Sequence, residues 1–401
     1  QINGLSNNEK ANLLLEKHTF KELLADVEQR NLQNNIVGLE ASRLFARSEI
    51  NMGVDAFRDS LYAMLKRNTF LNIKFENMLD TLGEMSRTDL YSYLKEWEQL
   101  TPLPFYSIGE PELTKVVNKG GEEFFVLKVL VSNNSDYDGI IQMNVLQNGW
   151  WYQPMEDPRA RKKVEIAAHT SKEFVSVWEE QIRDVEINTM VSGNLPYMIR
   201  QSIGNVKQER NKIVKDTIYT LPESSLEMPG EVIVDNEDST LFVLSTPAVV
   251  GLLPKWLDKV EDTSFKYSGI SWWRAPLQWT ATTNAKYYGK YIRSAYVIKS
   301  GDGSQTATWK IPVPEAGQYE LYYHVFKDDE LRWNDRLQGE YHFRVAYDSE
   351  MEDAYINLRK ANEGWEQLGT YYFSADTVRV VLTDECKLRS VTADAVKIVK
   401  R

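Results

Sequence analysis

The sequence EYHFRVAY at residues 340–347 alternates apolar and polar side chains with a period of two. Three further runs near the end of the chain show similar alternation: GWEQLGTYYF at residues 364–373, VRVVLT at 378–383 and ADAVKIV at 393–399. Alternation over such short runs, interrupted by Asp, Asn and Gly, is typical of antiparallel strands that bury one face. We therefore expect the chain to end in a β-sandwich.

Length and composition limit the classes of protein to which the chain belongs. At 401 residues we expect roughly two or three domains rather than one core. The formal charge of −11 argues against a nucleic-acid partner, because phosphate binding needs concentrated Lys and Arg. Cys386 is the single cysteine, so no intramolecular disulfide is expected. No run of about 18 apolar residues occurs, so we expect no membrane span.

The start of the chain bears on its cellular location. It begins at Gln1 without a methionine and shows no signal peptide, so we expect a processed or excised piece of a longer protein. An export signal and upstream domains would then lie outside this sequence, and those domains are expected partners. Because exported proteins can do without disulfides, one cysteine is compatible with a secreted, periplasmic or cell-surface location.

Residues 1–104 have the apolar spacing of helices. Ser6 and Glu9 form a predicted capping box at the start of the first helix. Pro102 and Pro104 end the helical region, because proline has no N–H to donate and biases its predecessor to extended geometry. We therefore predict a helical bundle over residues 1–104.

Packing positions in this region resemble the tail of the catalytic domain in aminopeptidase N-type zinc peptidases, the gluzincins. The positions are Gly53, Phe57, Leu61, Leu65, Phe75, Leu79, Leu94, Trp97, Leu103 and Pro104. With the β-domain that follows, the resemblance extends over about residues 36–208. The zinc site of that family needs a His-Glu-x-x-His motif, which the chain lacks. We therefore predict no catalytic residues, no metal and no cofactor, and expect no enzymatic activity from this chain alone.

Residues 105–215 change from helical spacing to a period of two. Phe124, Val126 and Leu130 alternate with other side chains, and residues 136–139 have turn chemistry before the next apolar run. Short alternating strands separated by turns predict an immunoglobulin-like β-sandwich. The gluzincin resemblance also implies a β-domain directly after the helices.

Residues 216–401 combine the alternating strands with separate motifs in a defined order. They include EVIVDNED at 231–238, YGKY at 288–291, ATWKIPVPEAGQYELY at 307–322, INL at 356–358 and GW at 364–365. In this order they resemble the golvesin C-terminal-like domain, also found at the ends of proteins labelled xanthan lyases, over about residues 230–399. The resemblance implies a β-jelly-roll of the galactose-binding type and no known catalytic residues.

Individual side chains in this domain carry structural expectations. Trp309 and Trp365 lie among alternating residues and are predicted to be buried in the core. Asp394 lies between two alanines, and we expect it to accept hydrogen bonds from a loop backbone, because an unpaired buried charge is costly. Residues 235–238 offer oxygen ligands that suit calcium, but they lack a calcium-loop pattern and are interpreted as a turn.

Aromatic side chains with polar neighbours mark two candidate ligand sites, SWWRAPLQW at residues 271–279 and the charged loop 327–336. Such groups suit a sugar, because an aromatic ring stacks on the sugar while polar groups bind its hydroxyls. They suit equally a buried junction between domains, where Trp and Arg are also favoured. The predicted ligand-binding residues are Trp272, Trp273, Arg274, Trp279, Tyr288 and Trp333.

These observations predict a multidomain α + β protein with a helical bundle, an immunoglobulin-like β-sandwich and a C-terminal β-jelly-roll. The first hypothesis is a non-catalytic binding region of an exported bacterial protein, with a polysaccharide or cell-surface glycan as its partner. The second is the accessory C-terminal half of a zinc metallopeptidase whose catalytic residues lie upstream. The third is a structural spacer or protein-interaction module.

Overall fold

The computed structural model describes residues 2–96, 99, 102–147, 157–210, 214–223, 226, 230–245, 265–267, 269–271, 274–327 and 339–401. The chain divides into two compact units, which are described separately below. The N-terminal unit is Ser6–Leu226, and the C-terminal unit is Glu227–Arg401 together with Gln1–Leu5.

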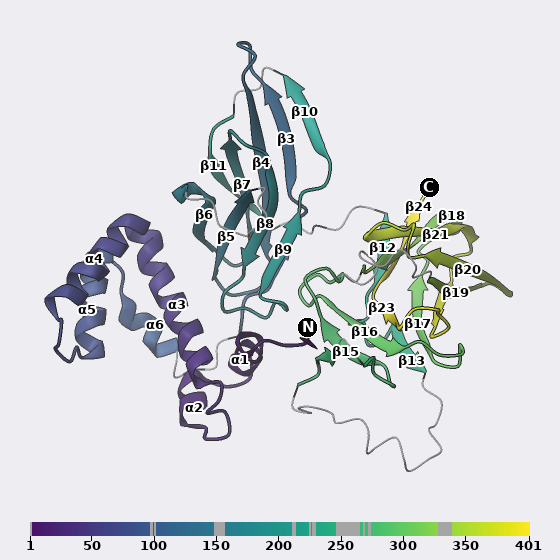
Figure 1. Ribbon diagram of the computed structural model, residues 1–401, viewed down its shortest axis with the longest axis horizontal. Coiled ribbons are helices and arrows are strands. Elements are labelled where there is room, and N and C mark those ends of the chain that lie inside the picture. The colour runs from purple at the N-terminus through teal and green to yellow at the C-terminus, as the bar shows by residue number, and fades with distance from the viewer. Residues whose placement is uncertain are drawn as a thin grey trace. The chain divides into compact units, whose positions relative to one another are not determined.

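Helices form the first part of the N-terminal unit (Figure 1). They are α1 (Asn7–Leu15), α2 (Phe20–Ala25), α3 (Gln33–Met52), α4 (Val54–Arg67), α5 (Phe75–Ser86) and α6 (Leu90–Glu96). The predicted capping box of α1 is confirmed. The Glu9 amide donates to Ser6 Oγ at 3.3 Å, and the Ser6 amide donates to Glu9 Oε2 at 2.6 Å. Two amides that have no partner within the helix are thereby satisfied.

The strands of the N-terminal unit follow the helices. They are β2 (Tyr106–Ile108), β3 (Glu112–Val117), β4 (Glu123–Asn133), β5 (Gly139–Gln147), β6 (Arg161–Ile166), β7 (Thr170–Trp178), β8 (Ile182–Asn188), β9 (Met198–Ser202), β10 (Val206–Arg210) and β11 (Thr217–Pro222). One sheet has the order β10–β3–β4–β7–β11 with β2 paired to β4, and another has the order β6–β5–β8–β9. Leu127 and Val129 of β4 belong to the same core as Ile141 and Met143 of β5. The two sheets therefore share one hydrophobic core.

Helix α3 joins the helices to these strands. Its Ala46 is fully buried and packs with Ile140 of β5 and with Met190. Lys163 of β6 pairs with Glu49 of α3 across the same contact. Apolar packing and an ion pair thus hold the helical region against the β-strands within this unit.

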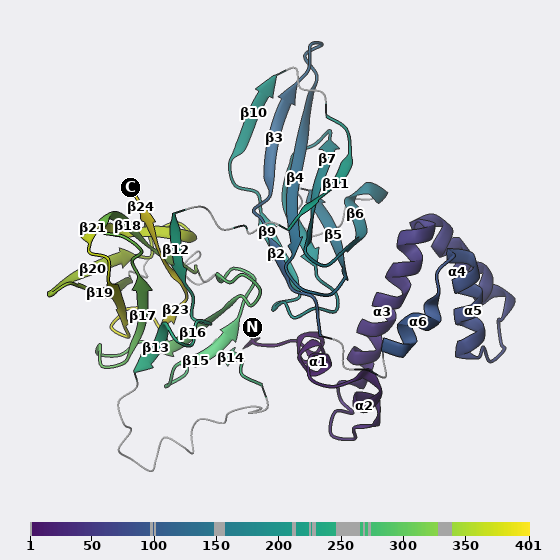
Figure 2. The same cartoon turned by 180° about the vertical axis from the view of Figure 1, so that it is seen from behind.

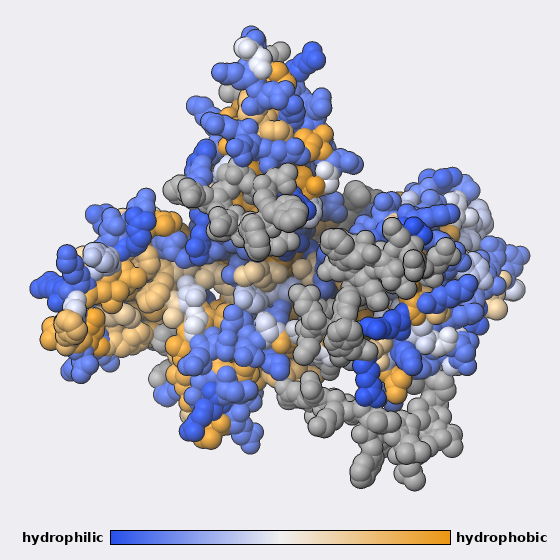
Figure 3. All heavy atoms as spheres, in the orientation of Figure 1, coloured by the Kyte–Doolittle hydropathy of each residue, from blue (hydrophilic) through white to orange (hydrophobic). Residues whose placement is uncertain are grey.

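Apolar side chains also remain exposed over α4 and α5 (Figure 3). Phe70, between these helices, is fully exposed and has a φ of 65°. Tyr62 and Leu65 of α4 are exposed as well, while Phe57 is buried with Leu79 of α5. These helices therefore bury one apolar side and leave another at the surface.

The C-terminal unit is built from strands (Figure 2). They are β1 (Ile2–Asn3), β12 (Glu231–Val234), β13 (Phe242–Ser245), β14 (Ile270–Ser271), β15 (Thr280–Thr283), β16 (Ser294–Lys299), β17 (Thr306–Pro312), β18 (Gly317–Val325), β19 (Glu340–Tyr347), β20 (Glu350–Asn357), β21 (Gly364–Phe373), β22 (Thr377–Thr383), β23 (Ser390–Ala393) and β24 (Val396–Lys400). We call the sheet β12–β24–β18–β21 the β18 sheet, and the sheet β13–β17–β22–β19–β20 the β22 sheet. Strands β15–β16–β23 and β1–β14 form smaller sheets.

Aromatic side chains fill the core between the β18 and β22 sheets. Trp309 of β17, Tyr323 of β18 and Phe343 of β19 are fully buried. The ring centroid of Tyr323 lies 6.1 Å from that of Trp309 and 4.9 Å from that of Phe343. The predicted burial of Trp309 is confirmed, and so is the alternation of β19, in which Tyr341, Phe343 and Val345 face the core.

The architecture is therefore α + β, with helices first and several β-sheets after them. None of the sheets that the described residues form closes into a barrel. The immunoglobulin-like and jelly-roll assignments, and the domain boundaries after residues 104 and 215, stay predictions. Among the helices described, none has the length and apolarity that crossing a membrane requires.

One histidine connects three segments of the N-terminal unit. His169 lies between β6 and β7 with a φ of 52°. Its Nε2 is 2.7 Å from Asp136 Oδ1 and its Nδ1 is 2.8 Å from Glu223 Oε2. Hydrogen bonds to Asp136 and Glu223 raise the pKa of His169 above its usual value. The imidazole thus links the β4–β5 turn to the end of β11.

Replacing His169 by Ala is expected to destabilise the protein in a pH-dependent way. Because the folded-state pKa is raised, the stabilisation is fully present below the unfolded-state value of about 6.5 and is lost as the pH rises through the folded-state value. Thermal unfolding midpoints at about pH 5 and about pH 9 should therefore differ from wild type mainly at the lower pH. The exposed His18→Ala variant is the control, and an equal loss at both pH values for His169→Ala would contradict the assignment.

Candidate ligand-binding face

A fully buried carboxylate organises one face of the C-terminal unit. Asp394 lies between β23 and β24, and its two oxygens accept hydrogen bonds from the Tyr288 backbone amide at 3.1 and 3.2 Å. The prediction that a loop backbone satisfies Asp394 is confirmed. Asp394 Oδ2 also lies 2.8 Å from His324 Nδ1, a partner that the sequence did not indicate. Burial raises the pKa of Asp394, while the His324 ring and the Tyr288 amide act in the opposite direction.

The hydrogen bond to Asp394 sets the chemistry of His324. Because Nδ1 contacts a carboxylate, it carries a proton, and in the neutral form of the ring Nε2 is then an acceptor. The side chain is 12% exposed, and Nε2 has no hydrogen-bond partner in the part of the chain that the structure describes. His324 therefore presents Nε2 at the outer face of the β18 sheet, where its neighbour in β21 is Trp365.

Trp365 lies outside the core, so the prediction that it is buried there is wrong. It pairs with His324, and the two ring centroids are 5.1 Å apart at an interplanar angle of 78°. The physical reason is a β-bulge. Leu321 of β18 pairs with Gly369, but the next residue, Tyr322, pairs with Gln367, so one residue of β21 is extra. One extra residue moves the following side chains to the opposite face of the sheet.

Further rings and one ion pair complete this face. The Tyr288 ring centroid lies 5.0 Å from that of Trp365 and 5.8 Å from that of His324. Lys397 Nζ is 4.9 Å from the Trp365 ring centroid and 2.7 Å from Glu231 Oε1. The Lys397 and Glu231 side chains are only 11% and 10% exposed, so each charge is neutralised locally. We call this group the outer-face cluster; its members are Glu231, Tyr288, Tyr322, His324, Trp365 and Lys397.

An acidic turn lies close to the buried carboxylate. The Asp238 amide donates to the Asp235 carbonyl at 3.1 Å, which confirms the predicted turn at residues 235–238. Glu237 in this turn pairs with Lys266 at 2.5 Å and accepts a hydrogen bond from Tyr267 at 3.1 Å. Burial and the nearby Asp394 raise the pKa of Asp235 well above its usual value. This side of the unit therefore carries several acidic groups.

The predicted ligand-binding residues do not form one group in the structure. Trp272, Trp273 and Trp333 lie outside the described residues. Arg274 is exposed, and Tyr288 belongs to the outer-face cluster. Trp279 is 9% exposed and packs in the core of the unit, so its ring is not available for stacking on a ligand. The structure thus brings only Tyr288 of this set to the cluster.

Sequence reasoning missed His324, Trp365, Lys397 and Glu231. Alternation without a bulge places Trp365 on the core face of β21, and the sequence pattern does not reveal the bulge. Lys397 of β24 pairs with Tyr322 of β18, whereas Glu231 lies in β12, near the start of the C-terminal unit. A polar residue at every second position of β18 was the available signal for an outer face, but it does not identify partners in other strands.

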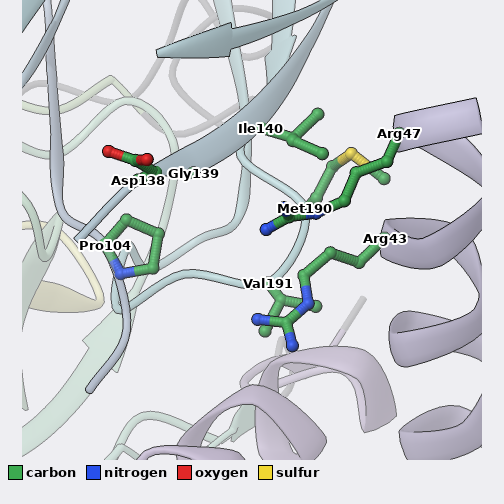
Figure 4. A pocket seen from close by; sticks show the side chains of 8 residues that line it. All are labelled: Arg43, Arg47, Pro104, Asp138, Gly139, Ile140, Met190 and Val191. Carbon is green, nitrogen blue, oxygen red and sulfur yellow. The ribbon is translucent and has the colours of Figure 1, made fainter. Parts of the chain in front are cut away.

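A small pocket in the N-terminal unit is a second place where charged groups meet (Figure 4). Arg43 and Arg47, one turn apart on α3, line it together with Asp138 and Gly139. Arg43 pairs with Glu40 at 3.1 Å, and the guanidinium carbon of Arg47 lies 3.6 Å from the centroid of the Tyr93 ring. The arginines are therefore already engaged within the protein, and we interpret the pocket as part of the junction between α3 and β5.

Close packing around Gly139 supports this interpretation. Tyr106 is fully buried, and burial raises the pKa of its hydroxyl. A Cβ atom at position 139 would lie 1.8 Å from that hydroxyl and 2.7 Å from Pro104 Cγ. A backbone without a side chain is therefore required where β5 begins.

The comparison with protein families gives a match within the C-terminal unit. Residues 273–400 match the family model described as Golvesin C-terminal domain. This match confirms the resemblance found from the motifs, and it includes Tyr288, His324, Trp365 and Lys397 of the outer-face cluster. No curated protein matches the chain.

Solved structures give distant similarities. A xanthan lyase from Paenibacillus is 16% identical, with 75% of this chain and 27% of that chain covered at a TM-score of 0.30. A β-glucuronidase from Bacteroides uniformis is 12% identical, with 79% of this chain and 32% of that chain covered at a TM-score of 0.21. This chain thus spans about a third or less of the length of these proteins. The aminopeptidase N-type resemblance of residues 36–208 gains no support from these matches.

The raised pKa of Asp235 predicts a stabilising substitution. The folded protein retains a proton that the unfolded chain loses above about pH 4, so stability falls as the pH rises from there through the folded-state pKa. Asp235→Asn removes this titration. Calorimetry should therefore show that the midpoint of the variant minus that of wild type is larger at about pH 7.5 than at about pH 4. The control is Asp302→Asn, whose midpoint relative to wild type should stay constant over this range, because hydrogen bonds from Ser304 lower the pKa of Asp302 and confine its titration to lower pH. A pH-independent effect of Asp235→Asn would contradict the assignment.

Gly139→Ala is expected to destabilise the N-terminal unit by about 1–3 kcal/mol, because Tyr106 and Pro104 must move away from the new methyl group. Denaturant unfolding measures the change. Gly38→Ala is the matched control, since no atom lies within 4 Å of its added Cβ and alanine favours the helix by up to about 1 kcal/mol. Unchanged stability of Gly139→Ala would mean that this contact is loosely packed.

Proposed function

We propose that this chain is a non-catalytic binding region of an exported bacterial protein, and that its C-terminal unit binds carbohydrate through the outer-face cluster. The observation that carries the proposal is the position of Trp365. A tryptophan placed outside the core between a histidine, a tyrosine and a lysine combines an apolar ring with hydrogen-bonding groups.

The chemistry of the cluster suits a saccharide. A pyranose ring has C–H groups that pack against an aromatic ring and hydroxyls that bind polar groups at its edge. Trp365 and Tyr288 supply rings whose centroids lie 5.0 Å apart, and His324 Nε2 supplies an acceptor beside them. Strand pairing and the buried Asp394 hold these groups in place, so little conformational entropy is lost on binding.

The family match supports the proposal because it includes every member of the cluster except Glu231. The jelly-roll assignment belongs to the same proposal. A secreted, periplasmic or cell-surface location would bring the unit into contact with polysaccharide or cell-surface glycan. Upstream domains of a longer parent protein would supply any catalysis.

The two other hypotheses are separated from this one by simple observations. An accessory role in a zinc peptidase requires a His-Glu-x-x-His motif upstream of this segment in the parent gene. A structural spacer requires no saccharide affinity at all. The predicted candidates Trp272, Trp273, Arg274 and Trp333 remain part of the proposal as additional ligand contacts.

Trp365→Ala is expected to weaken polysaccharide binding by about tenfold or more, because removal of a central ring at a binding site costs more than about 1.4 kcal/mol. Affinity electrophoresis in gels with xanthan, galactan, mannan or soluble glucan measures retardation of the full chain. Tyr355→Ala, an exposed ring on the β22 sheet, is the matched control, and circular dichroism verifies folding of both variants. Trp272→Ala and Trp273→Ala test the other proposed contacts. Absence of retardation in every gel, or equal retardation of Trp365→Ala and wild type, would refute the proposal.

A further inference from the structure

Three basic side chains, two in β24 and one directly after it, are paired with acidic ones. Lys397 pairs with Glu231 at 2.7 Å, and both side chains are about nine-tenths buried. At the end of the same strand, Lys400 pairs with Glu315 at 2.5 Å, and the terminal Arg401 pairs with Glu320 at 2.7 Å. An anionic sugar would therefore have to compete with a carboxylate of the protein for each of these cations.

The Lys397–Glu231 pair is the most consequential of the three. Its ammonium lies 4.9 Å from the Trp365 ring centroid and 5.5 Å from that of Tyr322, so it contacts two rings of the cluster. Transferring it from Glu231 to a ligand carboxylate would leave Glu231 buried and uncompensated, which is strongly unfavourable. The ion pair thus closes the face to uronic acids while keeping the aliphatic part of Lys397 against the rings.

His324 favours the same class of ligand for a separate reason. In the neutral ring, with the proton on Nδ1 facing Asp394, Nε2 is an acceptor and needs a donor from the ligand. A sugar hydroxyl is such a donor, whereas an ionised carboxylate is an acceptor only. The buried carboxylate of Asp394 behind His324 adds to the repulsion of an anion.

We infer that the outer-face cluster selects a neutral hexose unit and excludes uronic acids, with His324 Nε2 accepting a hydrogen bond from a sugar hydroxyl. Asp394 acts as a positioning residue that sets the tautomer of His324. Glu231 acts as the residue that withholds Lys397 from anionic sugars. This inference rests on the proposed carbohydrate-binding function and specifies its ligand class.

The test compares matched neutral and acidic probes on the full chain by calorimetric titration. The probes are oligosaccharides of glucose, galactose and mannose, together with the corresponding oligomers of glucuronate, galacturonate and mannuronate. We expect at least one neutral oligosaccharide to bind about tenfold or more tightly than its uronate. Equal or tighter binding of the uronate would overturn the inference while leaving the proposed function intact. Binding of neither series would refute the proposed function and the inference with it.

Variants test the two residues that carry the specificity. His324→Ala should lower affinity for the neutral probe about tenfold, and His324→Gln should restore most of it, because the glutamine carbonyl is also an acceptor. Glu231→Gln should release Lys397 and raise uronate affinity relative to the neutral probe. If Glu231→Gln does not fold, the two His324 variants decide alone. Unchanged affinity of His324→Ala, or failure of folded Glu231→Gln to gain uronate binding, would overturn the assigned roles.

Discussion

The β-bulge in β21 is the constraint on which the outer-face cluster depends. Between Gly369 and Gln367 the pairing with β18 shifts by one residue. The side chains of residues 364–367, which precede the bulge in β21, therefore lie on the face opposite to the one that continued alternation would give them, and Leu368 packs against the core. Trp365 leaves the interior as a consequence and meets His324 on the other side of the sheet. Without the extra residue, the same alternation would bury this tryptophan beneath the sheet.

Burial of Asp394 is the second constraint, and it joins elements that are distant in sequence. A carboxylate without contact to water needs donors, and the donors available are the Tyr288 amide and the His324 ring. The loop after β15, strand β18 and the segment before β24 are therefore held together at one point. The same hydrogen bond that satisfies the carboxylate decides which nitrogen of His324 faces outward.

Much of the local structure followed from sequence pattern. The alternation of residues 340–347 identified β19 and its buried side chains, and Ser6 with Glu9 identified the start of α1. Residues 235–238 formed the expected turn. These features depend on neighbours within a few residues, where periodicity and capping rules apply directly. The aromatic segment at residues 271–279 was less informative, because its composition fitted a ligand site and a packed junction equally well, and Trp279 proved to be buried.

By itself, the sequence determined the class of fold, the order of helices and strands, and the golvesin-type character of the last domain. Those properties depend on hydrophobic period, turn residues and motif order, which are all local along the chain. Only the tertiary structure decided where Trp365 lies, which partner satisfies Asp394 and which carboxylate neutralises Lys397. The register of β18 against β21 and β24 is a contact between segments far apart in sequence, and a single bulge changes it. Side chains that meet through such pairing leave no mark in the pattern of either strand alone.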